Sequence, residues 1–146
     1  MILRIFKAVW FLSLLLILAI FLYVYASLPQ DIVIYEGQGA VMLTREALFY
    51  FALTIFALIN VLVFVVSRLY SKSAEDFLCW FYGLVMCLNV FLIIALNFIN
   101  LYNSNEKFDY DRIGYIIYGS LGLFVLWAIG WPFYLLSRKI LNKQSL

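Results

Sequence analysis

Four long stretches of this chain contain no charged residue, and this feature constrains the fold more than any other. They cover residues 8–30, 47–67, 77–105 and 113–137, and the shortest has 21 residues. A helix needs about 20 apolar residues to cross roughly 30 Å of hydrocarbon, so each stretch is long enough to cross a membrane once. The sequence therefore predicts an integral membrane protein with four transmembrane helices.

The composition excludes a soluble globular domain. Apolar residues make up 67% of the chain and charged residues 12%, whereas soluble domains are about 45–50% apolar and about 25% charged. The residues outside the four stretches form two tails and three loops. None of these is large enough for a soluble catalytic domain.

We expect an all-α membrane protein, an antiparallel four-transmembrane-helix bundle with a short β-hairpin on its outer face between the first and second helices. The whole chain, 1–146, forms a single membrane domain. Short links make consecutive helices antiparallel neighbours. The expected order is helix 5–25, outer loop 26–44, helix 45–67, inner loop 68–74, helix 75–101, outer loop 102–112, helix 113–136 and cytoplasmic tail 137–146.

The first outer loop carries the hairpin signal. Leu28-Pro29 ends the first helix. Two short apolar runs then flank a turn-like segment at residues 36–39. Two strands alone are marginally stable in water, so the hairpin should pack against something. Thr44 is the expected N-cap of the second helix, with Glu46 in its first turn. The expected contacts with a partner at the outer face are Ile32, Ile34, Tyr35, Val41 and Leu43.

The positive charges predict the orientation. The two tails, the middle loop and the helix ends beside them carry seven Lys or Arg residues and two acids, while the other two loops and the helix ends beside those carry three Lys or Arg residues and six acids. Cytoplasmic loops are enriched in Lys and Arg. We therefore expect a multi-pass protein of the bacterial inner membrane with both termini in the cytoplasm.

The first apolar segment also has the features of a signal peptide. A basic start, an apolar run and the small residues of Val24-Tyr25-Ala26 are compatible with cleavage after Ala26. The apolar run is longer than that of a typical signal peptide. We expect it to be retained as a transmembrane helix.

Amide side chains within the predicted spans need hydrogen-bond partners, because lipid offers none. On the third helix Asn89, Asn97 and Asn100 fall on one face, and Asn60 lies in the second helix. The expected helix-packing polar residues are Asn60, Asn89 and Asn97, and we expect Asn89 or Asn97 to bond across to another helix. The alternative is an amide-lined cavity for a polar ligand or a lipid headgroup.

Small residues form a second stripe, on the fourth helix. Gly119, Gly122 and Gly130 share one face, where another helix backbone can approach closely. This face packs either inside the chain's own bundle or against another subunit.

The sequence carries no recognisable catalytic or metal-binding pattern. It has no histidine, and Cys79 and Cys87 are too far apart on one helix for a disulfide. No charged residue lies in the centre of a span, which disfavours active ion transport. We expect no enzyme activity, no cofactor, no metal site and no nucleic-acid partner.

Several residues near the end of the first helix form a pattern, namely Tyr25, Leu28-Pro29, Ile32 and a later glycine, Gly37 or Gly39. Together they resemble the start of small multi-span membrane proteins related to SdpI-type immunity and signalling proteins, in which a Leu-Pro pair follows the first span. The resemblance covers the N-terminal third of the chain. It implies an immunity or signalling role.

Three functions are compatible with these features. The first is a non-catalytic accessory or structural subunit of a bacterial inner-membrane complex, such as a secretion, motility or envelope machine. The second is an immunity or signalling protein that binds a peptide or toxin at its outer face. The third is a lipid or small-molecule binder or carrier. The expected partners are membrane lipids and another membrane protein, in a hetero- or homo-oligomer.

The charge distribution predicts the topology directly. Reporter fusions placed after Tyr70 and after Lys107 should localise to opposite sides of the membrane. The Tyr70 fusion point lies in the basic loop 68–74, and the Lys107 fusion point lies in the acidic loop 102–112. Alkaline phosphatase and green fluorescent protein fusions measure this. Finding both fusion points on one side would contradict the four-span topology.

Overall fold

The computed structural model describes the chain except for residues 36–40, 71–73, 105–109 and 144–146. The helices are α1 (Ile2–Ser27), α2 (Arg45–Leu69), α3 (Glu75–Tyr102) and α4 (Tyr110–Lys143), and the strands are β1 (Asp31–Tyr35) and β2 (Val41–Thr44). The four helices in the described residues are each long and apolar enough to cross a membrane. The chain is thus a multi-pass membrane protein built from helices and one small sheet.

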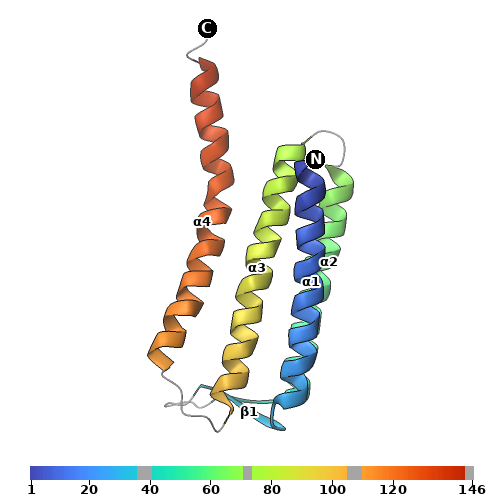
Figure 1. Ribbon diagram of the computed structural model, residues 1–146, viewed down its shortest axis with the longest axis vertical. Coiled ribbons are helices and arrows are strands. Elements are labelled where there is room, and N and C mark those ends of the chain that lie inside the picture. The colour runs from blue at the N-terminus through green and yellow to red at the C-terminus, as the bar shows by residue number, and fades with distance from the viewer. Residues whose placement is uncertain (36–40, 71–73, 105–109, 144–146) are drawn as a thin grey trace.

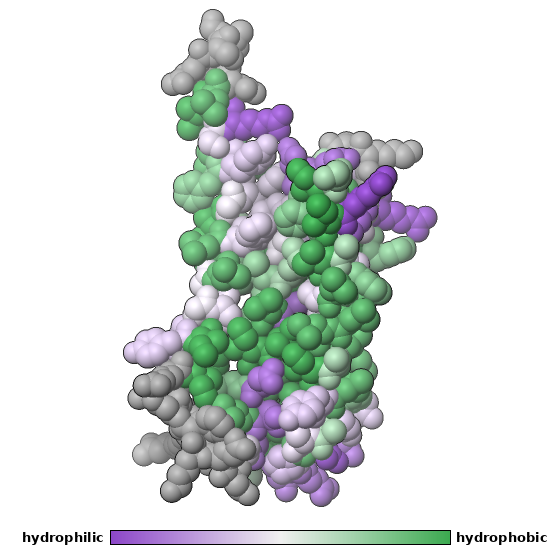
Figure 2. All heavy atoms as spheres, viewed as in Figure 1, coloured by the Kyte–Doolittle hydropathy of each residue, from purple (hydrophilic) through white to green (hydrophobic). Residues whose placement is uncertain are grey.

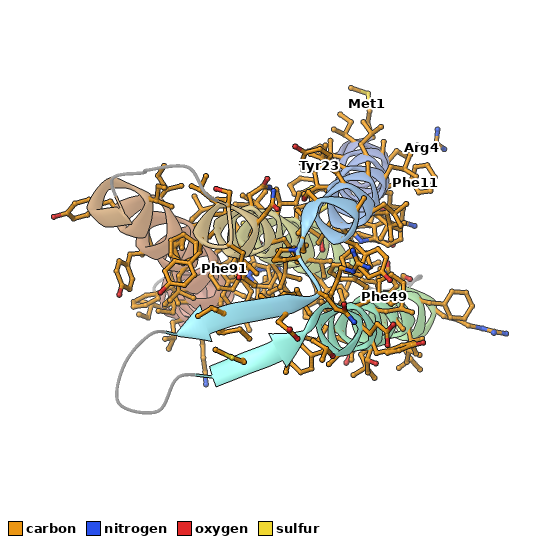
Figure 3. The ribbon with its side chains drawn as sticks, turned by 90° about the horizontal axis from the view of Figure 1, so that it is seen from below. Met1, Arg4, Phe11, Tyr23, Phe49 and Phe91 are labelled. Carbon is orange, nitrogen blue, oxygen red and sulfur yellow. The ribbon has the colours of Figure 1, made fainter. Side chains whose placement is uncertain are left out.

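Helix α3 lies at the centre of the fold. The helices alternate in direction along the chain, and the hairpin lies at the end where α1 finishes and α2 begins (Figure 1). Seen from this hairpin end, α1 and α2 lie on one side of α3 and α4 on the other (Figure 3). The antiparallel arrangement follows the sequence expectation. The bundle is more open than expected, because the main contacts of α4 are with α3.

Two apolar clusters hold α1, α2 and α3 together. Near the hairpin, Phe21 of α1 stacks on Phe49 of α2 and meets Phe56 edge-on, with ring centroids 5.1 and 5.2 Å apart. The second cluster, nearer the opposite end, contains the buried Val63 and Phe81. Most other apolar side chains point outward and cover the helices (Figure 2). Such a surface suits lipid, since soluble proteins rarely expose large continuous apolar areas.

The expected hairpin is confirmed as a two-stranded antiparallel sheet. Ile32 pairs with Leu43 and Val33 with Met42. Ile32 is fully buried among residues of α1 and α2, so the hairpin is anchored by its side chain. The expected turn at residues 36–39 lies outside the described residues. Thr44 caps α2 as expected, its hydroxyl accepting a hydrogen bond from the Ala47 amide at 3.2 Å.

Helix α4 is the longest element, and it extends past the start of α3 (Figure 1). Its 34 residues span ~51 Å at 1.5 Å per residue. The helix continues through Pro132, although proline cannot donate a hydrogen bond to the Ala128 carbonyl. It also continues beyond residue 136, where the sequence analysis ended the span, as far as Lys143.

A reciprocal pair of tryptophans joins α4 to α3. The Nε1 of Trp80 donates to the Trp127 carbonyl at 2.8 Å, and the Nε1 of Trp127 donates to the Trp80 carbonyl at 2.9 Å. The buried Gly83 lies beside them, and a Cβ atom there would overlap the Trp127 ring. The Trp127 indole therefore packs against α3 because residue 83 has no side chain.

Gly83→Ala should weaken the contact between α3 and α4. The added methyl group meets the Trp127 ring, and such overpacking costs about 1–3 kcal/mol. Thermal unfolding of the purified protein in mild detergent, followed by tryptophan fluorescence, measures the loss. Gly119→Ala is the matched control, because a Cβ there has nothing within 4 Å. Equal stability of the two variants would contradict this account of Gly83.

Candidate functional site

The buried amide of Asn89 joins α3 to α1. Its Nδ2 donates to Ser13 Oγ at 2.9 Å, and the Ser13 hydroxyl donates to the Trp10 carbonyl at 2.7 Å. The Asn89 residue is only 4% exposed. Inside an apolar environment the alternative to this bond is an unpaired amide, so the pair holds the two helices in register.

The other two asparagines expected to pack helices together bond to their own helices. Asn97 Nδ2 donates to the Ile93 carbonyl at 2.8 Å, and Asn60 Nδ2 donates to the Phe56 carbonyl at 2.7 Å. No hydrogen bond from either residue to another helix occurs among the described residues, so Asn89 is the member of the pair Asn89 or Asn97 that bonds across. The physical reason is the short side chain, which reaches the carbonyl one turn earlier more easily than a neighbouring helix.

A polar hollow opens between α1 and α3 near the hairpin end. The sides of the hollow are formed by two residues of α1 and by polar residues at the end of α3 and just after it. Figure 3 shows Tyr23 on the side of α1 that turns toward α3. The hollow has a volume of about 490 Å³. Its polar lining residues are Tyr23, Ser27, Asn97, Asn100, Asn103 and Ser104.

Three of these residues connect the hollow to the rest of the fold. The Ser27 hydroxyl lies 2.7 Å from Asn100 Oδ1, which links the ends of α1 and α3. The Asn103 amide accepts from the Val33 N–H at 2.8 Å and donates to the Val33 carbonyl at 3.1 Å. Asn103 thus pairs with strand β1 as a third strand would. The sequence analysis missed Asn103, although the three-residue spacing of Asn97, Asn100 and Asn103 was a usable signal.

Arg45 secures the junction between the hairpin and the helices. Its Nη1 donates to the Leu28 carbonyl at 3.2 Å, and its guanidinium lies 5.1 Å from the centre of the Tyr25 ring. A cation is favourable beside the carbonyls that end α1. This role was not predicted from the sequence, where Arg45 counted only as a charge at the start of the second helix.

The expected partner residues of the hairpin differ in accessibility. Ile32 is buried inside the chain and Leu43 is half-buried, so the accessible apolar side chains are Ile34, which is 43% exposed, and Met42, which is 68% exposed. The side chains of Tyr35 and Val41 lie outside the described part of the structure. Burial of Ile32 corrects the expectation that it contacts a partner.

The small residues of α4 are uncovered. A Cβ atom at Gly119, Gly122 or Gly130 would meet no neighbouring side chain or other helix within 4 Å in the described part of the chain. The stripe therefore lies to one side of the contact with α3 that Trp127 makes. Packing inside the chain's own bundle is the wrong alternative for this face.

Potential catalytic and metal-binding groups lie apart. The described residues contain no group of three His, Cys, Asp or Glu side chains placed to hold a metal ion. Cys79 is half-buried and Cys87 buried, and neither is in a disulfide. At the end opposite the hairpin, the Tyr134 hydroxyl donates to Asp76 at 3.3 Å, which ties α4 to the start of α3. The acidic loop residues 106–109 lie outside the described residues.

Comparison of the chain with protein-family models, curated proteins and solved structures finds no match. The resemblance to SdpI-type proteins therefore stays a prediction.

Asn89→Leu should lower the free energy of unfolding by about 0.6–2 kcal/mol, since it removes the bond from α3 to α1. Unfolding of the detergent-solubilised protein with sodium dodecyl sulfate measures the change. Asn97→Leu is the matched control and should leave stability within about 0.5 kcal/mol, because its amide bonds within α3. A larger loss in the control would contradict the assignment of these roles.

Proposed function

We propose that the chain is a non-catalytic accessory or structural subunit of a bacterial inner-membrane complex, with both termini in the cytoplasm. It acts by packing the glycine face of α4, formed by Gly119, Gly122 and Gly130, against a transmembrane helix of another polypeptide. The main support for this proposal is that a Cβ atom at any of these glycines would meet nothing within 4 Å in the described part of the chain. The excess of Lys and Arg in the tails and middle loop supports the orientation.

The contrast with Gly83 supports this function. The Trp127 ring occupies the space where a side chain of residue 83 would lie, whereas a Cβ atom at Gly119 or Gly122 would meet nothing within 4 Å. Glycine costs about 0.8–1 kcal/mol in a helix relative to alanine. Contact with lipid chains offsets little of this cost in helix stability. Close packing against the backbone of a neighbouring helix offsets more of it. An open glycine face therefore fits a protein partner better than lipid.

The position of α4 also supports a subunit role. Its main contacts are with α3, so most of its circumference is available. The apolar Leu126 in the same stripe is 74% exposed and would flank an incoming helix. Close approach at the glycines and side-chain contact at Leu126 together form a surface suited to helix association.

A second candidate is the immunity or signalling function. Exposed Ile34 and Met42 on the hairpin favour it, because they present apolar side chains on a small sheet whose β2 edge has no paired strand among the described residues. Peptides bind such edges by adding a strand. On this alternative the hairpin contacts the partner and the glycine face of α4 does not.

Gly119→Leu and Gly122→Leu should release the partner while the isolated chain stays folded, because the added side chains meet open space within the chain. Cross-linking in the native membrane, followed by mild detergent purification, measures the co-purified polypeptide or second copy. Gly114→Leu is the control, since Gly114 lies on the same helix but on a different face.

The control variant should retain the partner at the wild-type level. Retention in all three variants would contradict the proposal. Loss of the partner only when Ile34 and Met42 are replaced by serine would favour the immunity or signalling function instead.

A further inference from the structure

The polar hollow at the hairpin end contains hydrogen-bonding groups that the fold does not use. Asn97 Nδ2 is bonded to Ile93, but Asn97 Oδ1 has no hydrogen-bond partner among the described residues. The Tyr23 hydroxyl likewise has none there, and Tyr23 is 65% exposed. An acceptor and a hydroxyl thus face a space that the protein leaves open.

Asn100 adds a further open group. The Ser27 hydroxyl lies within hydrogen-bond distance of both the Val24 carbonyl and the Asn100 amide. It has one hydrogen, so it donates to one of them at a time. Whichever end of the Asn100 amide meets Ser27, the other end has no bond in the described residues and remains available. The hollow therefore offers both donors and acceptors.

The described lining of the hollow favours a neutral ligand over a charged one. Its lining residues in the described part of the chain are neutral, with amides, hydroxyls and one leucine. An ionic ligand would find no opposite charge among them, whereas amides and hydroxyls pair well with neutral hydroxyl groups. The Tyr23 ring adds a flat apolar surface next to these groups. A volume of about 490 Å³ lies within the range of about 300–1,000 Å³ typical of small-molecule sites.

We propose that this hollow binds a neutral sugar. The amides of Asn97 and Asn100 bind its hydroxyl groups, and the Tyr23 ring packs against its less polar face. The hollow lies at the last turns of α1 and α3, where a four-span chain leaves the hydrocarbon, and this is the level of lipid headgroups. The sugar is therefore either the headgroup of a membrane glycolipid or a free sugar. This site is independent of the α4 glycine face.

The test uses the full chain in nanodiscs of phosphatidylcholine, prepared without sugar-based detergents. One set contains monoglucosyl diacylglycerol and the other contains diacylglycerol, and native mass spectrometry measures the lipid that stays bound. Free glucose is titrated separately into nanodiscs of phosphatidylcholine alone, with saturation-transfer NMR as the measurement. We expect the glucosyl lipid, free glucose or both to bind the wild-type chain, in clear excess over diacylglycerol.

Asn97→Leu and Asn100→Leu should each reduce binding about fivefold, as expected for loss of about one hydrogen bond. Asn60→Leu is the matched control and should bind as the wild type, because Asn60 lies on α2 and bonds within that helix. Thermal unfolding of each variant verifies the fold. Asn97→Leu removes no contact between helices, so its result stands even where Asn100→Leu is destabilised.

The two arms identify the source of the sugar. Binding of the glucosyl lipid alone assigns the site to a headgroup, and binding of glucose alone assigns it to a free sugar. No binding above the diacylglycerol control, or binding that Asn97→Leu leaves unchanged, would overturn the proposal and leave water as the occupant of the hollow. Neither result would bear on the α4 partner, because these variants leave Gly119 and Gly122 intact.

Discussion

The need to pair polar groups where no water is available determines how this chain is assembled. Helix α3 and its C-cap residue form hydrogen bonds with three other elements, α1, α4 and β1. Its Asn89 amide bonds to Ser13 of α1, its Trp80 exchanges two hydrogen bonds with Trp127 of α4, and its C-cap residue Asn103 pairs with strand β1. Apolar side chains give no preferred register in lipid, so these few bonds fix where each neighbour lies.

Features set by nearby residues could be predicted from the sequence. Uninterrupted apolar stretches predicted four helices long and apolar enough to cross a membrane, because hydrocarbon thickness sets the minimum length of such a helix. The alternation around Ile32, followed by a turn-like segment, correctly predicted a hairpin. The capping role of Thr44 followed from its place before the apolar run. Each inference needed only a short window of sequence.

Features that depend on a distant partner were missed or misassigned. Periodicity placed Asn89 and Asn97 on one face of α3, but it does not say where α1 crosses that face. One amide reaches Ser13 and the other bonds to Ile93 on its own helix. Gly83 was overlooked because its role depends on the Trp127 ring, which the sequence alone does not bring near it. The burial of Ile32 follows from packing of the hairpin against α1 and α2.

The glycines and asparagines of the helices therefore fall into two groups. Some have a packing or hydrogen-bond partner within the chain, and others have none among the described residues. Gly83 and Asn89 have partners inside the fold, and both act in assembly. Gly119 and the outward end of Asn97 have none among the described residues. A glycine without a neighbour costs helix stability with no packing gained in exchange, and an exposed amide oxygen that lines a polar hollow pairs with water or with a ligand. Their positions on different helices separate an apolar contact surface from a polar one, so a helix and a hydroxylated ligand would not compete for the same place.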